Sequence, residues 1–167
     1  LIRENATGAM RTMGRFGEAL GQFRWPFMTV IGADGYVLIT EAIGSRVQRL
    51  SPREQWAGQI GRWGVEPGQL YRPKGITVDA SGQIYVGDST LNVVQVFGPR
   101  GDLVGVLTDG SGNLLRFQHP MGMCFDRRGR LLVVELRADR IAVVEMGTAT
   151  APGASRRSGS ASGRARG

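Results

Sequence analysis

Three prolines spaced 47 residues apart have neighbours whose side chains bind anions or aromatic groups. These neighbours are three cationic residues, a histidine, a glutamine and a tryptophan: Arg24, Trp25, Arg72, Lys74, Gln118 and His119. Arginine and lysine bind phosphates and carboxylates, and tryptophan stacks on flat rings, including those of nucleic-acid bases. A fold that brings Pro26, Pro73 and Pro120 to one face would therefore place a ligand-binding surface there.

The same 47-residue period extends through the strand-like segments that must position these residues. Each proline is followed at one offset by an apolar run, over 37–39, 84–86 and 131–133. An acid comes two residues after each run, at Glu41, Asp88 and Glu135, and an aliphatic residue lies 21 places after each proline. A period in this range, carried by short β-type runs, indicates one four-stranded propeller blade per repeat.

The middle repeat shows the four expected strands most clearly, at 75–79, 83–87, 93–97 and 103–107. Turn sequences that begin with Asp or Pro and contain Gly separate the first strand from the second and the third from the fourth, and each repeat is predicted to be an antiparallel meander. Gly75 and Gly122 would lie on the innermost strand, where neighbouring blades approach closely. Met28 takes that place in the first repeat, which predicts a looser centre there.

The domain prediction is a set of blades over 1–147 and a flexible Arg/Gly/Ser/Ala-rich tail over 148–167. Segment 8–20 is expected to be the outer strand of a preceding or latched blade, since 14–22 lies one period before 61–69. The repeats occupy 21–64, 68–111 and 112–146, and the third stops after its third strand. Three blades cannot close a ring that usually has ~4–8. We expect completion by more of the same chain, by a second copy or by neighbours in an assembly.

Composition limits the classes of partner and compartment. The net charge is +7, but four of the arginines lie in the acid-free tail, which leaves +3 for 1–147. The single cysteine, Cys124, excludes a disulfide within the chain. No run approaches the ~20 apolar residues of a membrane span, so no membrane span is predicted. The sequence predicts no compartment.

The repeats resemble NHL repeats. The middle repeat carries the pattern best, with Gly68-Gln69-Leu70, Pro73, Gly75, Val78-Asp79, Ile84-Tyr85-Val86-Gly87-Asp88 and Val93-Val94-Gln95-Val96-Phe97. The resemblance covers about 8–146, with a fair third repeat and a weaker first one that lacks the turn aspartate and the glycine. It implies an all-β, NHL-type propeller, here partial or half of a six-bladed ring. The family includes RNA-binding, protein-binding and enzymatic members, so its function stays open.

In such a propeller, the loops entering strand one share a face with the loops joining strands two and three. The second set of loops adds Glu41, Ser89, Glu135 and Arg137 to that face. The predicted ligand-binding residues are Arg24, Trp25, Arg72, Lys74, His119 and Arg137. The alternative is that Trp25 packs between blades and that the arginines are merely solvated.

Metal and catalytic sites compete with structural roles for the same residues. The resemblance to lactonases suggests calcium on Glu41, Asp88 and Glu135, but an acid at a strand end commonly accepts backbone hydrogen bonds in the next turn. His119, Met121 and Met123 could form a soft-metal set, yet the methionine positions carry varied residues in the other repeats. A zinc lyase of this family uses several histidines, whereas this chain has one. The sequence therefore predicts no metal, no cofactor and no catalytic residue.

The favoured function is a non-catalytic binding or scaffolding module that mediates protein–protein interaction within a larger assembly. A fragment of an NHL-like enzyme, of the lyase or lactonase kind, is the first alternative. An RNA-binding propeller is the second, and the modest charge of +3 over 1–147 makes it less favoured.

Overall fold

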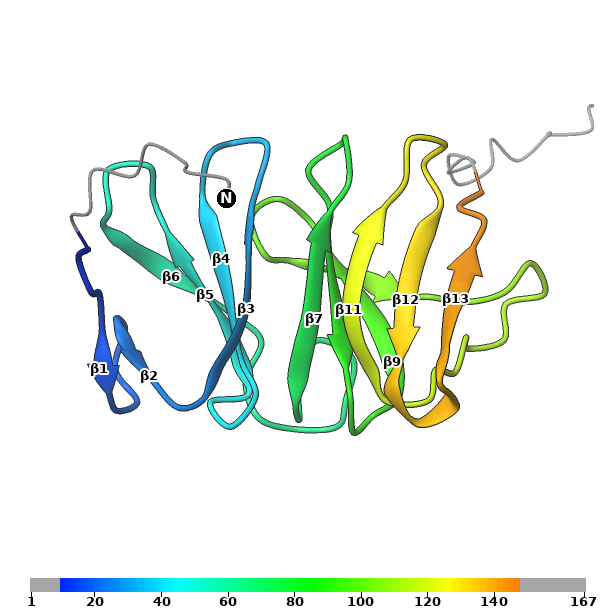
Figure 1. Cartoon of the computed structure of the whole chain (residues 1–167), viewed down its shortest axis with the longest axis horizontal. Coiled ribbons are helices and arrows are strands. Elements are labelled where there is room, and N and C mark those ends of the chain that lie inside the picture. Colours follow the sequence, from blue (N-terminus) through cyan, green and yellow to red (C-terminus); the bar gives the residue numbers. More distant parts are fainter. Residues whose placement is uncertain (1–9, 148–167) are drawn as a thin grey trace, which may run out of the picture.

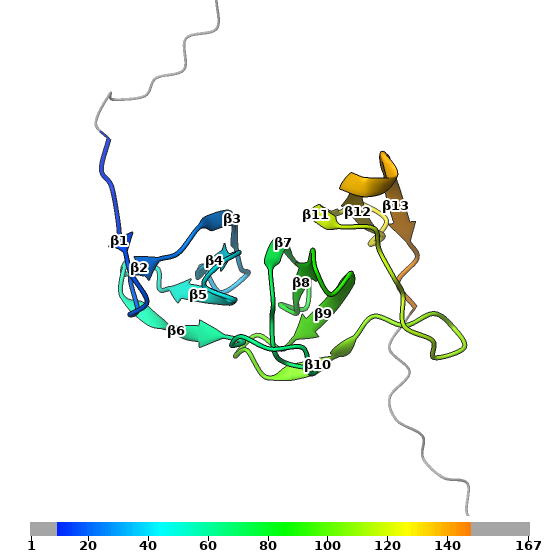
Figure 2. The same ribbon diagram turned by 90° about the horizontal axis from the view of Figure 1, so that it is seen from below.

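The computed structural model describes residues 10–147, and the predicted tail over 148–167 lies outside them. The described part of the chain is all-β apart from one short 3-10 turn, η1 (Leu136–Ala138). Three antiparallel sheets stand side by side as blades along an open arc, and their first strands line its concave side (Figure 2). This confirms the predicted fold class, a partial propeller.

Blades 1 and 2 are four-stranded meanders in which each strand pairs with the next along the chain. The strands of blade 1 are β3 (Pro26–Ile31), β4 (Val37–Glu41), β5 (Arg46–Leu50) and β6 (Trp56–Ile60). Those of blade 2 are β7 (Pro73–Val78), β8 (Ile84–Asp88), β9 (Val93–Phe97) and β10 (Leu103–Val106). The predicted strands of the middle repeat lie within two residues of these bounds.

Blade 3 has three strands within the described residues: β11 (Pro120–Phe125), β12 (Leu131–Glu135) and β13 (Arg140–Val144). β13 pairs with β12 along its whole length. Blade 3 lies at one end of the arc, and no further sheet formed by the described residues stands beyond it (Figures 1 and 2).

The segment ahead of blade 1 differs from the expected outer strand over 8–20. Among its described residues only β1 (Arg15–Phe16) is a strand, and β1 pairs in parallel with β2 (Gln22–Phe23). The bridge between Trp63 and Leu70 repeats this pairing one period later. Residues 10–14 form no strand.

Two apolar cores hold the blades together, one at each seam between neighbouring blades. The seam between blades 1 and 2 buries Val47, Ile76, Val86 and Phe97 among others. The seam between blades 2 and 3 buries Val94, Phe117, Met123 and Leu131 with their neighbours. Blades 1 and 2 therefore each bury apolar side chains against the next blade, as expected of stacked repeats.

Gly75 shows why the inner strands require a glycine. A Cβ on this residue would lie 2.3 Å from the carbonyl oxygen of Met121 in blade 3. The predicted close approach therefore occurs at Gly75. At Gly122, the corresponding residue of blade 3, the nearest atom to a Cβ is Val134 Cγ2 at 3.7 Å, within the same sheet. No helix in the described part of the chain is long and apolar enough to cross a membrane.

Candidate functional site

Four of the six predicted ligand-binding residues come together where the chain enters β7 and β11 and where η1 follows β12. β7 and β11 begin at the lower edge of Figure 1. Lys74 Nζ lies 3.3 Å from His119 Nε2, across the seam between the two blades. The backbone carbonyl of Arg72 accepts a hydrogen bond from the backbone N–H of Ser89 at 3.1 Å, and this bond fixes the backbone of Arg72. The backbone N–H of Arg137 donates to the carbonyl of Gln118, which places η1 beside the loop that carries His119. We call Arg72, Lys74, His119 and Arg137 the basic cluster.

The electrostatics of His119 reflect this crowding of positive charge. Its pKa lies below the ordinary histidine value, first because of burial and then because Lys74, Arg137 and Arg72 repel an added proton. A hydrogen bond to the backbone of Ser89 partly opposes the shift. The imidazole is therefore neutral near pH 7. Because the Lys74 ammonium can only donate, its contact with His119 is a hydrogen bond when Nε2 is the unprotonated ring nitrogen.

Arg24 and Trp25 do not join the basic cluster. The Arg24 guanidinium forms an ion pair with Glu18, with Nη1 2.7 Å from Oε1, in the segment ahead of blade 1. Trp25 is 70% exposed and has a left-handed backbone, with φ of 63°. Trp25 is thus too exposed to be packed between blades, and among the described residues its ring makes no cation–π contact.

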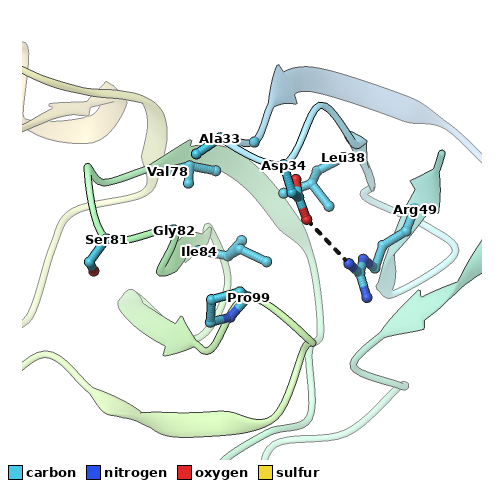
Figure 3. Close-up of a pocket in the computed structure, with 10 residues that line it drawn as sticks. Ala33, Asp34, Leu38, Arg49, Val78, Ser81, Gly82, Ile84 and Pro99 are labelled. Atoms are coloured by element: carbon cyan, nitrogen blue, oxygen red, sulfur yellow. Dashed lines mark ion pairs between the residues drawn. The ribbon is translucent and has the colours of Figure 1, made fainter. Parts of the chain in front are cut away.

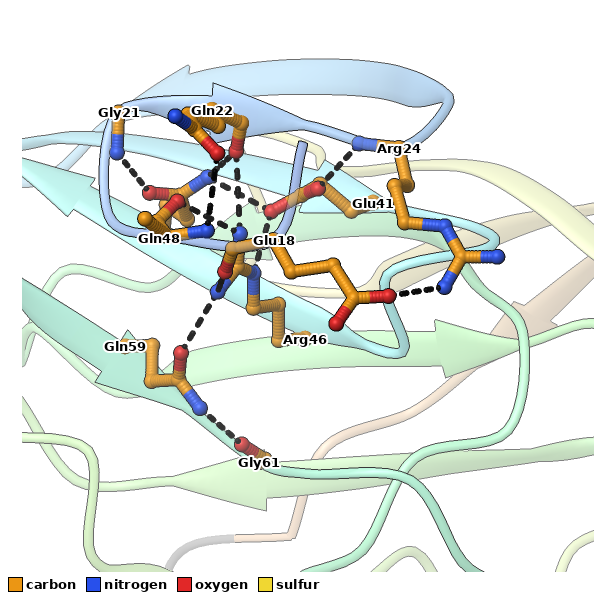
Figure 4. Close-up of polar contacts among 10 residues, drawn as sticks. Glu18, Gly21, Gln22, Arg24, Glu41, Arg46, Gln48, Gln59 and Gly61 are labelled. Atoms are coloured by element: carbon orange, nitrogen blue, oxygen red, sulfur yellow. Dashed lines mark hydrogen bonds and ion pairs between the residues drawn. The ribbon is translucent and has the colours of Figure 1, made fainter. Parts of the chain in front are cut away.

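The three recurrent acids are buried and already occupied by donors from the protein. Glu41 accepts from the backbone N–H of Arg24 at 2.7 Å, from Arg46 Nε at 2.6 Å and from Gln48 Nε2 at 2.7 Å (Figure 4). The Arg46 guanidinium also donates to the carbonyl oxygens of Glu18, Ala19 and Gln22. The acid thus ties the loop entering the blade to the third strand of the same blade.

Asp88 and Glu135 repeat this arrangement with local changes. Asp88 accepts only backbone N–H groups, from Tyr71, Arg72, Thr90 and Leu91. Glu135 accepts from the backbone of Gln118 at 2.6 Å and from Arg140 Nε at 2.5 Å, and its pKa is lowered chiefly by Arg140. These contacts are those expected of acids with a structural role. The described residues contain no group of three His, Cys, Asp or Glu side chains placed to hold a metal ion.

Blade 3 exposes apolar side chains at positions that are buried in blade 2 and, for two of the three, in blade 1 as well. Ile141 is 58% exposed, whereas its counterparts Val47 and Val94 are fully buried. Val143 is 50% exposed against 6% for Val96, and Val134 is 42% exposed against 0% for Thr40. We call Val134, Ile141 and Val143 the open face of blade 3.

Comparison with protein families matches the NHL repeat at residues 70–97, the strands and loops that include Arg72 and Lys74. A virginiamycin B lyase and a putative gluconolactonase, two solved structures that resemble most of this chain, are propeller proteins. The fold is an NHL-type propeller. A search of curated protein sequences finds no match.

Three solved structures illustrate the resemblance of this NHL-type propeller. A putative exported protein of Bacteroides fragilis superimposes with a TM-score of 0.57 at 16% identity, over 71% of this chain and 31% of its own. A putative gluconolactonase gives 0.56 at 17% identity, over 74% and 45%. A catalytically inactive virginiamycin B lyase of Staphylococcus aureus, solved with quinupristin, gives 0.53 at 15%, over 80% and 44%. The chain thus spans less than half the length of each of these structures.

A small pocket lies at the opposite end of the propeller, at the seam between blades 1 and 2 (Figure 3). Its volume is about 160 Å³, and its walls are the β3–β4 and β7–β8 turns with Leu38, Ile84 and Pro99. Arg49 borders it, 3.7 Å from Asp34 and stacked on Tyr36. Its Nε is buried without a hydrogen-bond partner among the described residues. None of the predicted site residues lines this pocket.

The open face was missed at the residue level, although the sequence contained a signal for it. Val47, Val94 and Ile141 occupy one position of the repeat, so their common burial is the natural expectation. The ending of the third repeat after its third strand indicated an unpaired edge. It did not show that the broad side of the blade, as well as its edge, would be uncovered.

Proposed function

We propose that this NHL-type propeller is a non-catalytic binding module that docks a protein partner on the open face of blade 3. The observation that carries the proposal is the exposure of Ile141 at a position that is fully buried in the other two blades. Burying an aliphatic side chain contributes about 1.5–3 kcal/mol. Three such residues on one sheet face provide a driving force for association.

The repeat also indicates the shape of a matching partner. Val47 is covered by blade 2 and Val94 by blade 3, through the sides of those blades that carry Ile76 and Met123. A surface that covered Ile141 in the same way would have the shape of that side of a further blade. The partner surface is thus expected to resemble a propeller blade.

A second copy of this chain can supply such a surface. Thr29, Ile31 and Val37 of blade 1 are the repeat equivalents of Ile76, Val78 and Ile84, which face blade 1 across its seam. Thr29 is exposed and Ile31 is 68% exposed, so this side of blade 1 is available. Two copies that each place blade 1 on the other's blade 3 would close a ring with two-fold symmetry.

The mass of the chain in solution tests this proposal. We expect twice the chain mass of 18.0 kDa by light scattering at micromolar concentration. Ile141→Asp should shift the protein to the monomer, because a charge would be buried in the contact. Val104→Asp is the matched control, since Val104 is 57% exposed but lies on the outer strand of blade 2. The control should keep the wild-type mass.

A wild-type chain that stays monomeric at 100-fold higher concentration would exclude the second copy as the occupant. Equal dissociation by Ile141→Asp and Val104→Asp would exclude the open face as the contact. Covalent trapping adds a further test through Cys124, which is exposed and is the repeat equivalent of Thr77. With oxidised glutathione as the oxidant, an Ile31→Cys variant should form a dimer in which a disulfide joins the introduced thiol of one copy to Cys124 of the other, whereas the wild-type chain should not.

The enzyme alternative rests on likeness to a lyase and a putative gluconolactonase at 15–17% identity, which supports the fold and not an activity. Metal analysis of the purified chain addresses it directly. Stoichiometric zinc or calcium would favour the enzyme alternative over a purely binding role. The RNA-binding alternative is tested with the basic cluster below.

A further inference from the structure

The basic cluster is built from two blades and three separate segments. Arg72 precedes β7, Lys74 lies on β7, His119 precedes β11, and Arg137 lies in η1. Backbone hydrogen bonds fix these segments: Ser89 N–H to Arg72 C=O at 3.1 Å and Leu136 N–H to His119 C=O at 3.2 Å. Across the seam, Lys74 Nζ lies 3.3 Å from His119 Nε2. The positive charges of Lys74, Arg137 and Arg72 all act on His119, whose pKa they lower.

Among the described residues, Arg72, Lys74 and Arg137 take part in no ion pair. Ion pairs in this part of the chain involve other arginines, such as Arg24 with Glu18 and Arg140 with Glu135. Buried Asp88 lies behind Arg72, where its carboxylate accepts four backbone N–H groups and offsets one charge. With Glu135 paired to Arg140, the groups around neutral His119 retain an excess of positive charge. Such a convergence costs stability unless an anion shares it.

The chemistry of the cluster favours a compact anion with several acceptor oxygens. Two guanidinium groups and an ammonium group match the oxygens of a phosphate group, to which arginine donates two parallel hydrogen bonds. The positive charge is also local. Arg24 on the same end of the propeller is neutralised by Glu18, and Lys74 Nζ lies 5.4 Å from the centre of the Phe27 ring in blade 1. An extended polyanion would need a longer run of free cations.

From this arrangement we infer that Arg72, Lys74, His119 and Arg137 form a binding site for the phosphate group of a small molecule at the loop end of the arc. Lys74 and the two arginines supply the charge. Neutral His119 accepts a hydrogen bond from Lys74 and holds its ammonium in place. The site shares no residue with the open face of blade 3, so it stands independently of the proposed function.

His119 is the only histidine of the chain and therefore reports on this site without assignment ambiguity. The experiment follows its imidazole resonances by NMR through a pH titration, with inorganic phosphate or with sodium chloride at equal ionic strength. In chloride, the pKa of His119 should lie below the ordinary histidine value of 6.5. Bound phosphate places negative charge beside the ring and should raise that pKa.

Variants distinguish a built site from general screening. Lys74→Met and Arg137→Gln should each weaken phosphate binding at least about tenfold, because each removes a charge-assisted hydrogen bond. Arg128→Gln is the matched control, since exposed Arg128 lies in the β11–β12 turn at the other end of blade 3. Melting curves establish that each variant is folded. Arg72→Gln replaces Lys74→Met if the latter does not fold.

Three outcomes would overturn the inference: a phosphate effect no larger than that of chloride, an undiminished effect in the cluster variants, or an equal loss in Arg128→Gln.

A comparison of glycerol phosphate with oligouridylates of increasing length tests the ligand class. Saturable binding of glycerol phosphate with no gain along the oligomer series supports the small-molecule site. Binding only to the longer oligomers would replace it with an RNA surface. The titration is repeated with the Ile141→Asp variant, which is expected to be monomeric. An effect of phosphate on dimer formation is then not mistaken for phosphate binding at the basic cluster.

Discussion

The closed seam between blades 2 and 3 and the open face of blade 3 use the same positions of one repeat with opposite results. Val94 is fully buried in the seam, whereas Ile141, one period later, is more than half exposed. Gly75 touches the backbone of blade 3, whereas a Cβ on Gly122 would meet only its own sheet. The strands themselves are alike. The comparison shows that burial in this fold depends on the neighbouring blade and not on the strand pattern.

The buried ion pairs show the same contrast. In blade 1, Arg46 and Glu41 are both almost fully buried, and the arginine donates to three carbonyls of the incoming loop. In blade 3, Glu135 is 1% exposed but its partner Arg140 is 60% exposed. The same pair is therefore shielded from water in one blade and partly screened by it in the other.

The largest expected effect follows from breaking that ion pair. Glu41→Gln leaves the Arg46 charge buried without its partner and should lower the free energy of unfolding by about 3–5 kcal/mol. Glu135→Gln should cost clearly less, because the exposed Arg140 can be solvated once it is unpaired. Urea unfolding of both variants in the Ile141→Asp background checks the difference. Equal losses would mean that the two pairs are equally shielded.

A methyl group on the inner strand should have the next largest effect. Gly75→Ala places a carbon against the Met121 carbonyl and should cost up to about 3 kcal/mol, as overpacking does. Gly122→Ala should leave the stability of the monomer unchanged within about 0.5 kcal/mol. If a second copy covers blade 3, the same methyl group should instead weaken association, which sedimentation of Gly122→Ala would measure.

Truncating Val94 and Ile141, which occupy the same position of the repeat, should give a smaller difference in the free energy of unfolding. Val94→Ala removes two buried methyl groups and should cost about 2 kcal/mol. Ile141→Ala should change the monomer by less than about 0.5 kcal/mol. Thermal unfolding at a concentration where the chain is monomeric separates the two. A full cost at Ile141 in the monomer would show that its side chain is covered by the chain itself.

The smallest effect concerns Tyr85, which packs edge to face on Phe125 across the closed seam. Burial first, and then the nearby Asp79, raise the pKa of Tyr85 from 10.0 to about 12. Because the folded state favours the neutral phenol, this contribution is fully present below pH 10 and is lost as the pH rises toward 12. Ultraviolet titration of wild type and Tyr85→Phe should show one late-ionising tyrosine that the variant lacks. If Tyr85 instead ionised at the ordinary tyrosine pKa, the seam between blades 2 and 3 would be open to water around this side chain.

Much of the fold could be predicted from the sequence because it is carried by local and periodic signals. The turn aspartates Asp79 and Asp126 each accept backbone N–H groups two and four residues on, as the turn sequences indicate. The basic cluster was predicted in part. Lys74 and His119 meet, but Arg24 is drawn to Glu18, a pairing that depends on how the segment ahead of blade 1 turns back.

The amino-acid sequence alone specifies the 47-residue unit, its strand order, the glycine at the tight inner approach and the recurrent acid at the end of the second strand. These features depend on backbone geometry and on contacts within one repeat. The three-dimensional arrangement was needed to show which copies of each position are buried, which cations converge and which side of blade 3 faces water. Those properties depend on the neighbouring blade, and identical repeat positions gain or lose that neighbour according to their place in the arc.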